Sequence, residues 1–267
     1  GWLVEGALDR ARDDFMEYFF IFGRKTESQD IGFYLSYNSQ NRSTDGAGAE
    51  GANLKTSFWA FDFFIQNSFD PVDLSTEVVL ISGKTSGNNI LAINAAARAE
   101  FNLSPQWRLL IEPGYSSGTS ESDFANGDIK SFAFSKDYDV SLLVFEEALP
   151  GGPVTRDSTG AATGNVSTAP HSGAISNAIY GRLKLSYDAA SFFKPAINVV
   201  VPFAAKVPAE AGGRLYGVEY DILTRWPITP YWSAQFDFGH FIPMSFYDKV
   251  SRSHSTVVVR GGLTATF

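Results

Sequence analysis

The sequence contains no cysteine and no run of about 18 apolar residues that could cross a bilayer as a helix. The lack of cysteine excludes disulfides and thiolate metal sites, although it does not name a compartment. Charged residues make up 19% of the 267 positions, below the roughly one quarter of a typical soluble domain. The net charge of −8 and the lack of a basic cluster argue against nucleic-acid binding. A soluble domain and a chain that spans a membrane as a closed β-barrel remain.

Aromatic residues are abundant, at 15% with 23 Phe, and many lie in segments of alternating polarity. In residues 91–103 the odd positions are apolar or small, whereas Arg98 and Glu100 stand at even positions. The same alternation recurs in residues 59–66, 107–115, 193–203, 216–226 and 257–267. These segments run for about 10 to 14 residues, longer than the usual soluble strand and long enough to cross a bilayer at a tilt.

The connections between these segments are of two kinds. Short turns are expected at residues 70–73, 104–106, 189–192 and 227–230. Long polar connections are expected at residues 38–53, 117–127, 147–173 and 207–214. Short turns on one side and long loops on the other are typical of outer-membrane barrels. The aromatic residues near segment ends would form an interfacial girdle: Trp107, Tyr187, Trp226, Tyr231 and Trp232.

The fold predicted from these features is all-β: a transmembrane antiparallel up-and-down β-barrel of about 12–14 strands over residues 15–267. The alternative is a soluble β-sandwich, which would bury the apolar positions in a core and needs no aromatic residues at strand ends. Opposed charges in the middle of the polar face favour the barrel.

Counting strands leaves a question at the N-terminus. If residues 128–147 form two strands that turn near 135–137, about 13 strands cross between Phe15 and Phe267. An odd number means that the first strand, residues 15–24, starts outside. Residues 1–14 would then be a lead-in or lumen segment, with a short helix at 6–14, or would add a crossing. Otherwise strands precede Gly1, and this is the C-terminal part of a larger barrel.

Catalytic patterns are weak. Residues 114–118 fit G-x-S-x-G, but a polar run follows in place of the helix that a nucleophile elbow requires. His171, His240 and His254 are too scattered for a metal motif. The sequence also lacks the strand-borne nucleophile pattern expected for a hydrolase of the outer-membrane phospholipase kind. We therefore expect no enzymatic activity and no catalytic residues.

An acidic loop offers the one candidate cation site. Glu121, Asp123 and Asp128 could together bind calcium, but their spacing is not that of an EF-hand. A solvated acidic loop is the preferred interpretation, and no metal or cofactor is expected.

Charged residues at polar-face positions are the candidate functional set. They would line a water-filled path, or else form cross-strand ion pairs that close a narrow barrel. Because both signs occur, strong selectivity for anions or cations is not expected. The set comprises Asp62, Glu77, Arg98, Glu100, Arg108, Glu112, Arg182, Lys184, Glu219, Asp221, Arg225, Asp237 and Arg260.

The C-terminal residues resemble those of Gram-negative outer-membrane barrels. Phe267 is last, and Val257, Val259, Leu263 and Ala265 share its parity. Assembly machinery of that class recognises a terminal aromatic residue preceded by alternating apolar residues, so these five positions would be the assembly signal and face lipid. Residues 110–115 and 134–146 are also similar to porin-like and alginate-export-like barrels.

The resemblance implies an integral protein of the bacterial outer membrane. Its expected function is a pore or exporter that lets small polar solutes or polysaccharide diffuse passively through a charged lumen. The alternatives are a structural barrel that anchors a larger envelope complex and an autotransporter-type translocator. Expected partners are outer-membrane lipid and lipopolysaccharide, the barrel-assembly machinery and, for the anchoring alternative, envelope-complex subunits; nucleic acid is not expected.

Overall fold

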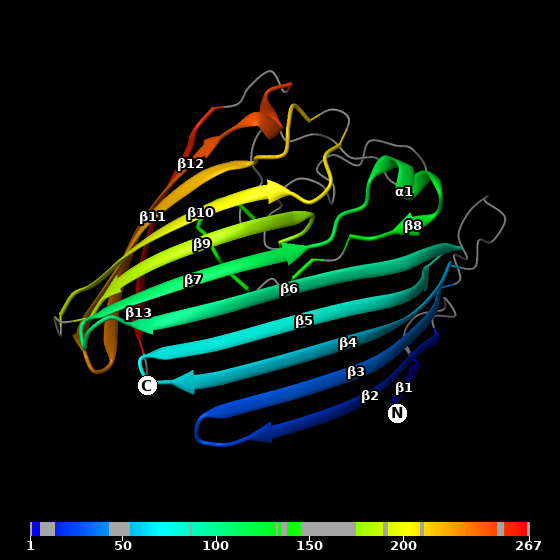
Figure 1. Ribbon diagram of the computed structural model, residues 1–267, viewed down its shortest axis with the longest axis horizontal. Coiled ribbons are helices and arrows are strands. Elements are labelled where there is room, and N and C mark those ends of the chain that lie inside the picture. Colours follow the sequence, from blue (N-terminus) through cyan, green and yellow to red (C-terminus); the bar gives the residue numbers. More distant parts are fainter. Residues whose placement is uncertain are drawn as a thin grey trace.

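The computed structural model describes residues 2–5, 14–42, 54–85, 87–131, 133–134, 138–145, 175–188, 192–208, 211–249 and 254–265. Twelve of its strands lie side by side in chain order in one antiparallel sheet (Figure 1). The strands on this path are β1 (Trp2–Glu5), β2 (Asp14–Lys25), β3 (Gln29–Arg42), β4 (Leu54–Phe69), β5 (Val72–Thr85), β6 (Asn88–Asn102), β7 (Trp107–Ser116), β9 (Ala178–Tyr187), β10 (Lys194–Ala204), β11 (Gly217–Thr229), β12 (Trp232–Pro243) and β13 (Thr256–Ala265).

Three short elements lie off this path. Strand β8 (Asp128–Ile129) pairs in parallel with β6, next to helix α1 (Glu121–Ala125) beyond the end of β7 (Figure 1). The 3-10 helix η1 (Ser245–Tyr247) follows β12. None of the helices among the described residues has the length and apolar character that a membrane-spanning helix requires.

The two faces of the sheet differ, as the alternation predicts. We define the inner face as the one that carries residues 138–145. In β6, Ala92 and Asn94 are buried at inner positions, whereas Leu91 and Ile93 are 56% and 39% exposed at outer positions. Outer positions elsewhere repeat this pattern: Trp59, Phe61, Phe63, Leu74, Ile111, Ile179, Leu183, Ile197, Tyr220, Ile222, Phe236, Val257 and Val259 are all exposed.

This exposed apolar face distinguishes the barrel type of sheet from a sandwich. A soluble β-sandwich would cover the apolar positions with a second sheet. Here the outer positions face away from the described chain, and an apolar band of this extent is what lipid-facing strands present. The prediction of an antiparallel up-and-down sheet is confirmed, although no pairing joins β13 to β1 among the described residues, so the sheet is open there.

Short turns gather at one end of the sheet, at the left of Figure 1. The hairpin from β4 to β5 closes at Asp70 and Pro71, as expected. The expected turn at 227–230 is misplaced: β11 continues through Pro227 to Thr229, with a register shift against β12, and the chain turns at Pro230 and Tyr231. Such an irregularity lets a strand continue past a proline that cannot donate to the ladder.

The prediction that residues 128–147 form two strands crossing the sheet is wrong for the described residues, where only the two-residue β8 forms. Strand β7 pairs directly with β9, and residues 138–145 form no strand but cross the inner face of the sheet. Residues 140–145 read VSLLVF, a nearly continuous apolar run that packs in a core instead of alternating between two environments. Without those two strands, eleven long strands remain, and β1 is the twelfth on the path.

Strand β1 pairs antiparallel with the N-terminal half of β2, with Trp2 opposite Glu17 and Glu5 opposite Asp14. The helix expected at residues 6–14 falls almost wholly outside the described residues, and Asp14 itself begins β2. Whether residues 1–14 are a lead-in or a lumen segment stays a prediction.

Replacing Ile222 tests the lipid-facing assignment. Ile222 is 51% exposed on the outer face in the middle of β11, opposite Ile197 and Phe238. We expect Ile222→Arg to lower the free energy of unfolding by about 2–4 kcal/mol, because an arginine near the bilayer midplane lacks water. Urea unfolding in phospholipid vesicles measures this. Gln66→Arg, on the exposed inner face of β4, is the matched control and should change little; equal losses would contradict the assignment.

Candidate functional site

Residues 138–145, hereafter the inner segment, run across the strands from β7 towards β13. Three of their backbone carbonyl groups accept hydrogen bonds from side chains of three different strands. The bonds run from Arg182 Nη1 to the Asp139 carbonyl oxygen (3.3 Å), from Asn198 Nδ2 to that of Val140 (2.9 Å) and from Arg260 Nη2 to that of Leu142 (2.9 Å). Backbone groups that would have been satisfied by a neighbouring strand are thus satisfied by side chains.

Glu219 in β11 provides the opposite contact, because its carboxylate accepts from consecutive backbone N–H groups. Oε1 lies 2.8 Å from the nitrogen of Leu142 and 2.7 Å from that of Leu143, and Oε2 lies 2.6 Å from that of Val144. Glu219 is fully buried. Three consecutive N–H groups converge on this one buried side chain, so Glu219 is the main anchor of the inner segment.

Glu112 in β7 holds the beginning of the inner segment. Its Oε1 accepts from the hydroxyl groups of Tyr138 (2.8 Å) and Tyr180 (3.2 Å), and its Oε2 lies 3.3 Å from Arg182 Nη1. Burial, and then the charge of Glu112, raise the pKa of Tyr138 above its usual value. The Tyr138 phenol therefore stays neutral and donates to the carboxylate over the physiological pH range.

Apolar side chains of the inner segment form a core against β9, β10 and β12. The buried cluster includes Val140, Leu143, Val144 and Phe145 together with Tyr180, Val200, Ala204, Phe241 and Phe246. The Phe145 ring meets that of Tyr180 edge-on at 6.1 Å. Gly239 in β12 allows the close approach, since a Cβ there would lie 3.1 Å from Leu142 Cβ and 2.9 Å from Asp221 Oδ1.

Two further carboxylates are buried beside this core. Asp221 Oδ2 accepts from Asn198 Nδ2 at 2.8 Å, and Asp237 accepts from the Gln235 side chain. Asp221 and Asp237 are 1% and 2% exposed. Asn198 thus joins the inner segment and Asp221, because the same amide group donates to both.

The remaining charged residues of the predicted set also occupy inner-face positions, by their register with the residues above. Arg98 and Arg108 lie 3.9 Å and 3.4 Å from the Glu100 carboxylate, and Arg108 also lies 3.6 Å from Asp188. Lys184 and Arg225 make no ion pair or hydrogen bond within the described part of the chain. Asp62 on β4 and Glu77 on β5 lie outside this group of ion pairs.

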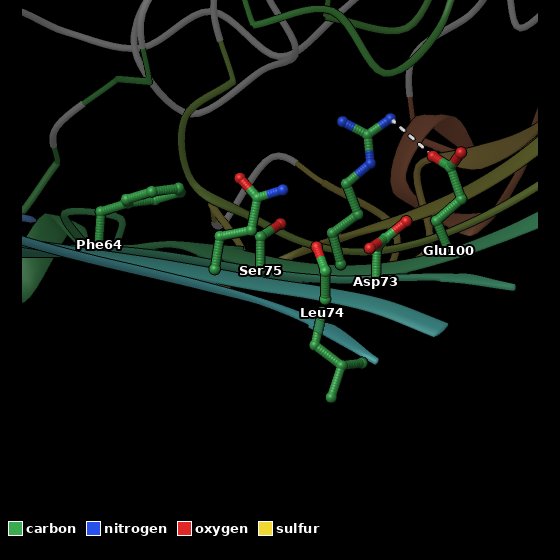
Figure 2. A pocket seen from close by; sticks show the side chains of 8 residues that line it. Phe64, Asp73, Leu74, Ser75 and Glu100 are labelled. Atoms are coloured by element: carbon green, nitrogen blue, oxygen red, sulfur yellow. Dashed lines mark ion pairs between the residues drawn. The ribbon is translucent and has the colours of Figure 1, made fainter. Parts of the chain in front are cut away.

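A cavity of about 520 Å³ adjoins this group on the inner face of β4, β5 and β6. In Figure 2 the side chains of Phe64, Asp73, Ser75 and Glu100 project from one side of the sheet, whereas Leu74 projects from the other. The full lining is Phe64, Gln66, Ser68, Asp73, Leu74, Ser75, Arg98 and Glu100. Most of these groups are polar, so the cavity suits a solute with hydrogen-bonding groups.

Sequence reasoning missed the uncharged partners, chiefly Tyr138, Tyr180 and Asn198. The signal available for Tyr180 and Asn198 was an uncharged polar residue at an inner position of a strand. Tyr138 gave no such signal, because it lies in the inner segment, which forms no strand and has no alternation of faces.

Both serines of residues 114–118 are buried, and Ser117 has a structural role. Ser117 Oγ donates to the carbonyl oxygen of Lys130 and accepts from the backbone N–H of Ile93 at 2.9 Å. Ser116 and Ser117 are buried at 0% and 6% exposure. His240 shares the outer face with Val257 and Tyr220, away from these serines, and His171 lies outside the described residues.

A lysine occupies the acidic loop that was considered for calcium. Lys130 Nζ lies 2.6 Å from Asp123 Oδ1 and 3.8 Å from Asp128 Oδ2. In the described ranges, no group of three metal-ligating side chains comes together.

The predicted assembly signal lies partly within the described residues. Val257, Val259 and Leu263 are 54%, 59% and 71% exposed on the outer face of β13, and Ala265 ends that strand. Phe267 lies outside the described residues, so the signal stays a prediction.

No protein-family model matches the chain, and no curated protein matches it in sequence. Among solved structures, the FrpB iron transporter from Neisseria meningitidis shares 12% identity, with a TM-score of 0.50 over 91% of this chain and 37% of that one. The NanC porin shares 8% identity, with a TM-score of 0.43 over 96% of this chain and 99% of that one. Outer membrane phospholipase A from Escherichia coli shares 10%, with a TM-score of 0.35 over 96% and 78%.

At such low sequence identity, structural similarity is evidence of the fold alone. The two structures with TM-scores below 0.5 are too distant to support a conclusion about this chain. This chain spans just over a third of FrpB. Together with the two-faced antiparallel sheet, the FrpB likeness defines the class: an outer-membrane type of β-barrel sheet. One fold serves many activities, so function must be argued from the inner face.

Removing the Glu219 carboxylate should release the inner segment. Three buried N–H groups would lose their acceptor, each at a cost of about 1–3 kcal/mol. The chain has no cysteine, so Ser141→Cys, at a buried position, gives a single reporter thiol. We expect a water-soluble maleimide to label this thiol slowly, and much faster when Glu219→Ala is added. Glu77→Ala is the control, and equal labelling in all three proteins would contradict the anchor.

Asp123 should keep its loop ordered in mild acid. Hydrogen bonds from Lys130 and Ser120 hold the pKa of Asp123 well below its usual value. A lowered folded-state pKa contributes stability that is present above the unfolded value near 4 and is lost as pH falls through the folded value. Hydrogen exchange of residues 117–131 should therefore show unchanged protection from pH 7 down to about 4. Asp123→Asn should reduce that protection already at pH 7; if it does not, the ion pair is not what orders the loop.

Proposed function

We propose that this chain forms a pore of the bacterial outer membrane through which small polar solutes diffuse passively. The observation that supports it most is the contrast between the faces from β4 to β13: the outer one is apolar and exposed, and the inner one is charged and crossed by an anchored segment. Contact with lipid accounts for the exposed apolar side chains of the outer face, and a water-filled path accounts for the charged side chains of the inner face.

The inner segment sets the width of the path in this proposal. It covers the inner face from β7 to β13, where its core and its hydrogen bonds leave side chains buried. The cavity on β4 to β6 lies beside this covered part. Solutes would therefore pass along the wall of β4 to β6 and the adjoining charged residues, and their size would be limited by the inner segment.

A closed anchoring barrel is the second candidate function. It is favoured by the core that the inner segment builds against β9, β10 and β12, because such a core stabilises a scaffold whether or not solutes pass. Export of polysaccharide and autotransport remain expectations from the sequence.

Conductance separates the two candidates. The protein, refolded and inserted into planar lipid bilayers, should give discrete conductance steps. Glu219→Ala should raise the conductance of each step, because the inner segment no longer narrows the path, whereas Glu77→Ala should leave it nearly unchanged. Insertion is verified independently, because the strands of an inserted protein are protected from added protease in vesicles. A correctly inserted protein without conductance would overturn the pore and favour the anchor.

A further inference from the structure

Four acidic residues of the inner face are buried, whereas several of its basic residues are well exposed. Glu112, Glu219, Asp221 and Asp237 are each at most 2% exposed, and each accepts at least one hydrogen bond from a protein donor. By contrast, the side chains of Arg98, Arg108 and Lys194 are 50%, 48% and 45% exposed. These four carboxylates and Arg182 hold the fold, whereas Arg98, Arg108 and Lys194 remain in contact with water.

The cations of β6, β7, β9, β10 and β11 that make no contact with the inner segment form one group, hereafter the basic patch, in which Lys184 is partly buried and the others are exposed. Its members are Arg98, Arg108, Lys184, Lys194 and Arg225. Two carboxylates lie among them: Glu100 contacts Arg98 and Arg108, and Asp188 contacts Arg108 and Lys194. Two negative charges against five positive ones leave the patch with a positive excess.

Lys184 and Arg225 carry this excess. Arg225 stands directly opposite Lys194 in the ladder, and like charges facing each other across strands are destabilising. Lys194 is satisfied by Asp188 at 2.8 Å, whereas Arg225 has no acidic partner within the described residues. Among the charges that act most strongly on Lys184, Arg182, Arg98 and Arg225 repel it, and Glu100 is the acid.

We propose that the basic patch is a binding subsite for solutes that carry a carboxylate or phosphate group, with Lys184 and Arg225 as the residues that contact the oxyanion. An oxyanion between them would relieve the mutual repulsion of the cations and would accept charge-assisted hydrogen bonds from both. This inference rests on the proposed pore and names the class of solute that it favours.

The adjoining cavity fits the rest of such a solute. Arg98 belongs to both the patch and the cavity lining, so the two are continuous. Gln66, Ser68 and Ser75 offer hydrogen bonds to an uncharged polar portion of the solute. Asp73, opposite Glu100, makes this end of the site more acidic, so the oxyanion belongs at the Lys184 end.

Binding and conductance together test the proposal. The probes are gluconate, inorganic phosphate and the neutral sugar glucose, each titrated into the folded protein in detergent at low salt by calorimetry. We expect gluconate, phosphate or both to bind, and glucose to bind at least tenfold more weakly. The double variant Lys184→Gln, Arg225→Gln should weaken anion binding by roughly tenfold or more, as expected for lost charge-assisted contacts. In bilayers under a KCl gradient, the wild-type reversal potential should indicate a preference for chloride, and the double variant should shift it towards zero.

Lys25→Gln is the matched control, because Lys25 is an inner-face cation at the end of β2, paired with Asp30 and remote from the patch. It should change neither binding nor reversal potential. Circular dichroism and thermal unfolding confirm that each variant is folded. Anion binding that is absent, or equal in the double variant and the wild type, overturns the subsite, even if the protein conducts. Binding without conductance supports the subsite and overturns the pore instead.

Discussion

The carboxylate of Glu219, with three consecutive backbone N–H groups on it, is the interaction on which the interior depends. A segment without strand partners cannot lie against a sheet unless its polar backbone groups are satisfied. Glu219 satisfies the donors, and Arg182, Asn198 and Arg260 satisfy carbonyl groups. Once these bonds are made, the apolar side chains between them can pack on β9, β10 and β12.

The sheet itself follows from a simpler constraint. In a bilayer every backbone hydrogen bond must be made internally, so strands that span it must pair with neighbours on both sides. Local alternation then decides which side chains meet lipid. That is why the outer positions of β4, β6, β7 and β11 could be predicted from the sequence: each residue's face depends on its immediate neighbours alone.

The inner segment could not be predicted in the same way. Leu142, Leu143 and Val144 depend on a carboxylate 75 to 77 residues away, and the bond between Leu142 and Arg260 spans 118 residues. No local pattern encodes such partners, and an apolar run beside polar residues resembles a strand. The same limit applies to the charges, since the sequence gives their signs and faces but not which of them are buried. A balanced count of inner charges therefore did not reveal that four of the acids are buried.

Glu219 and Asp221 stand two positions apart in β11, and both lie beneath the inner segment that Glu219 anchors. If that segment moved away from the sheet, water would reach both carboxylates, and the space beside them would widen in the same step. In the proposed pore, this stretch of eight residues therefore controls both the width of the path and the exposure of these two carboxylates.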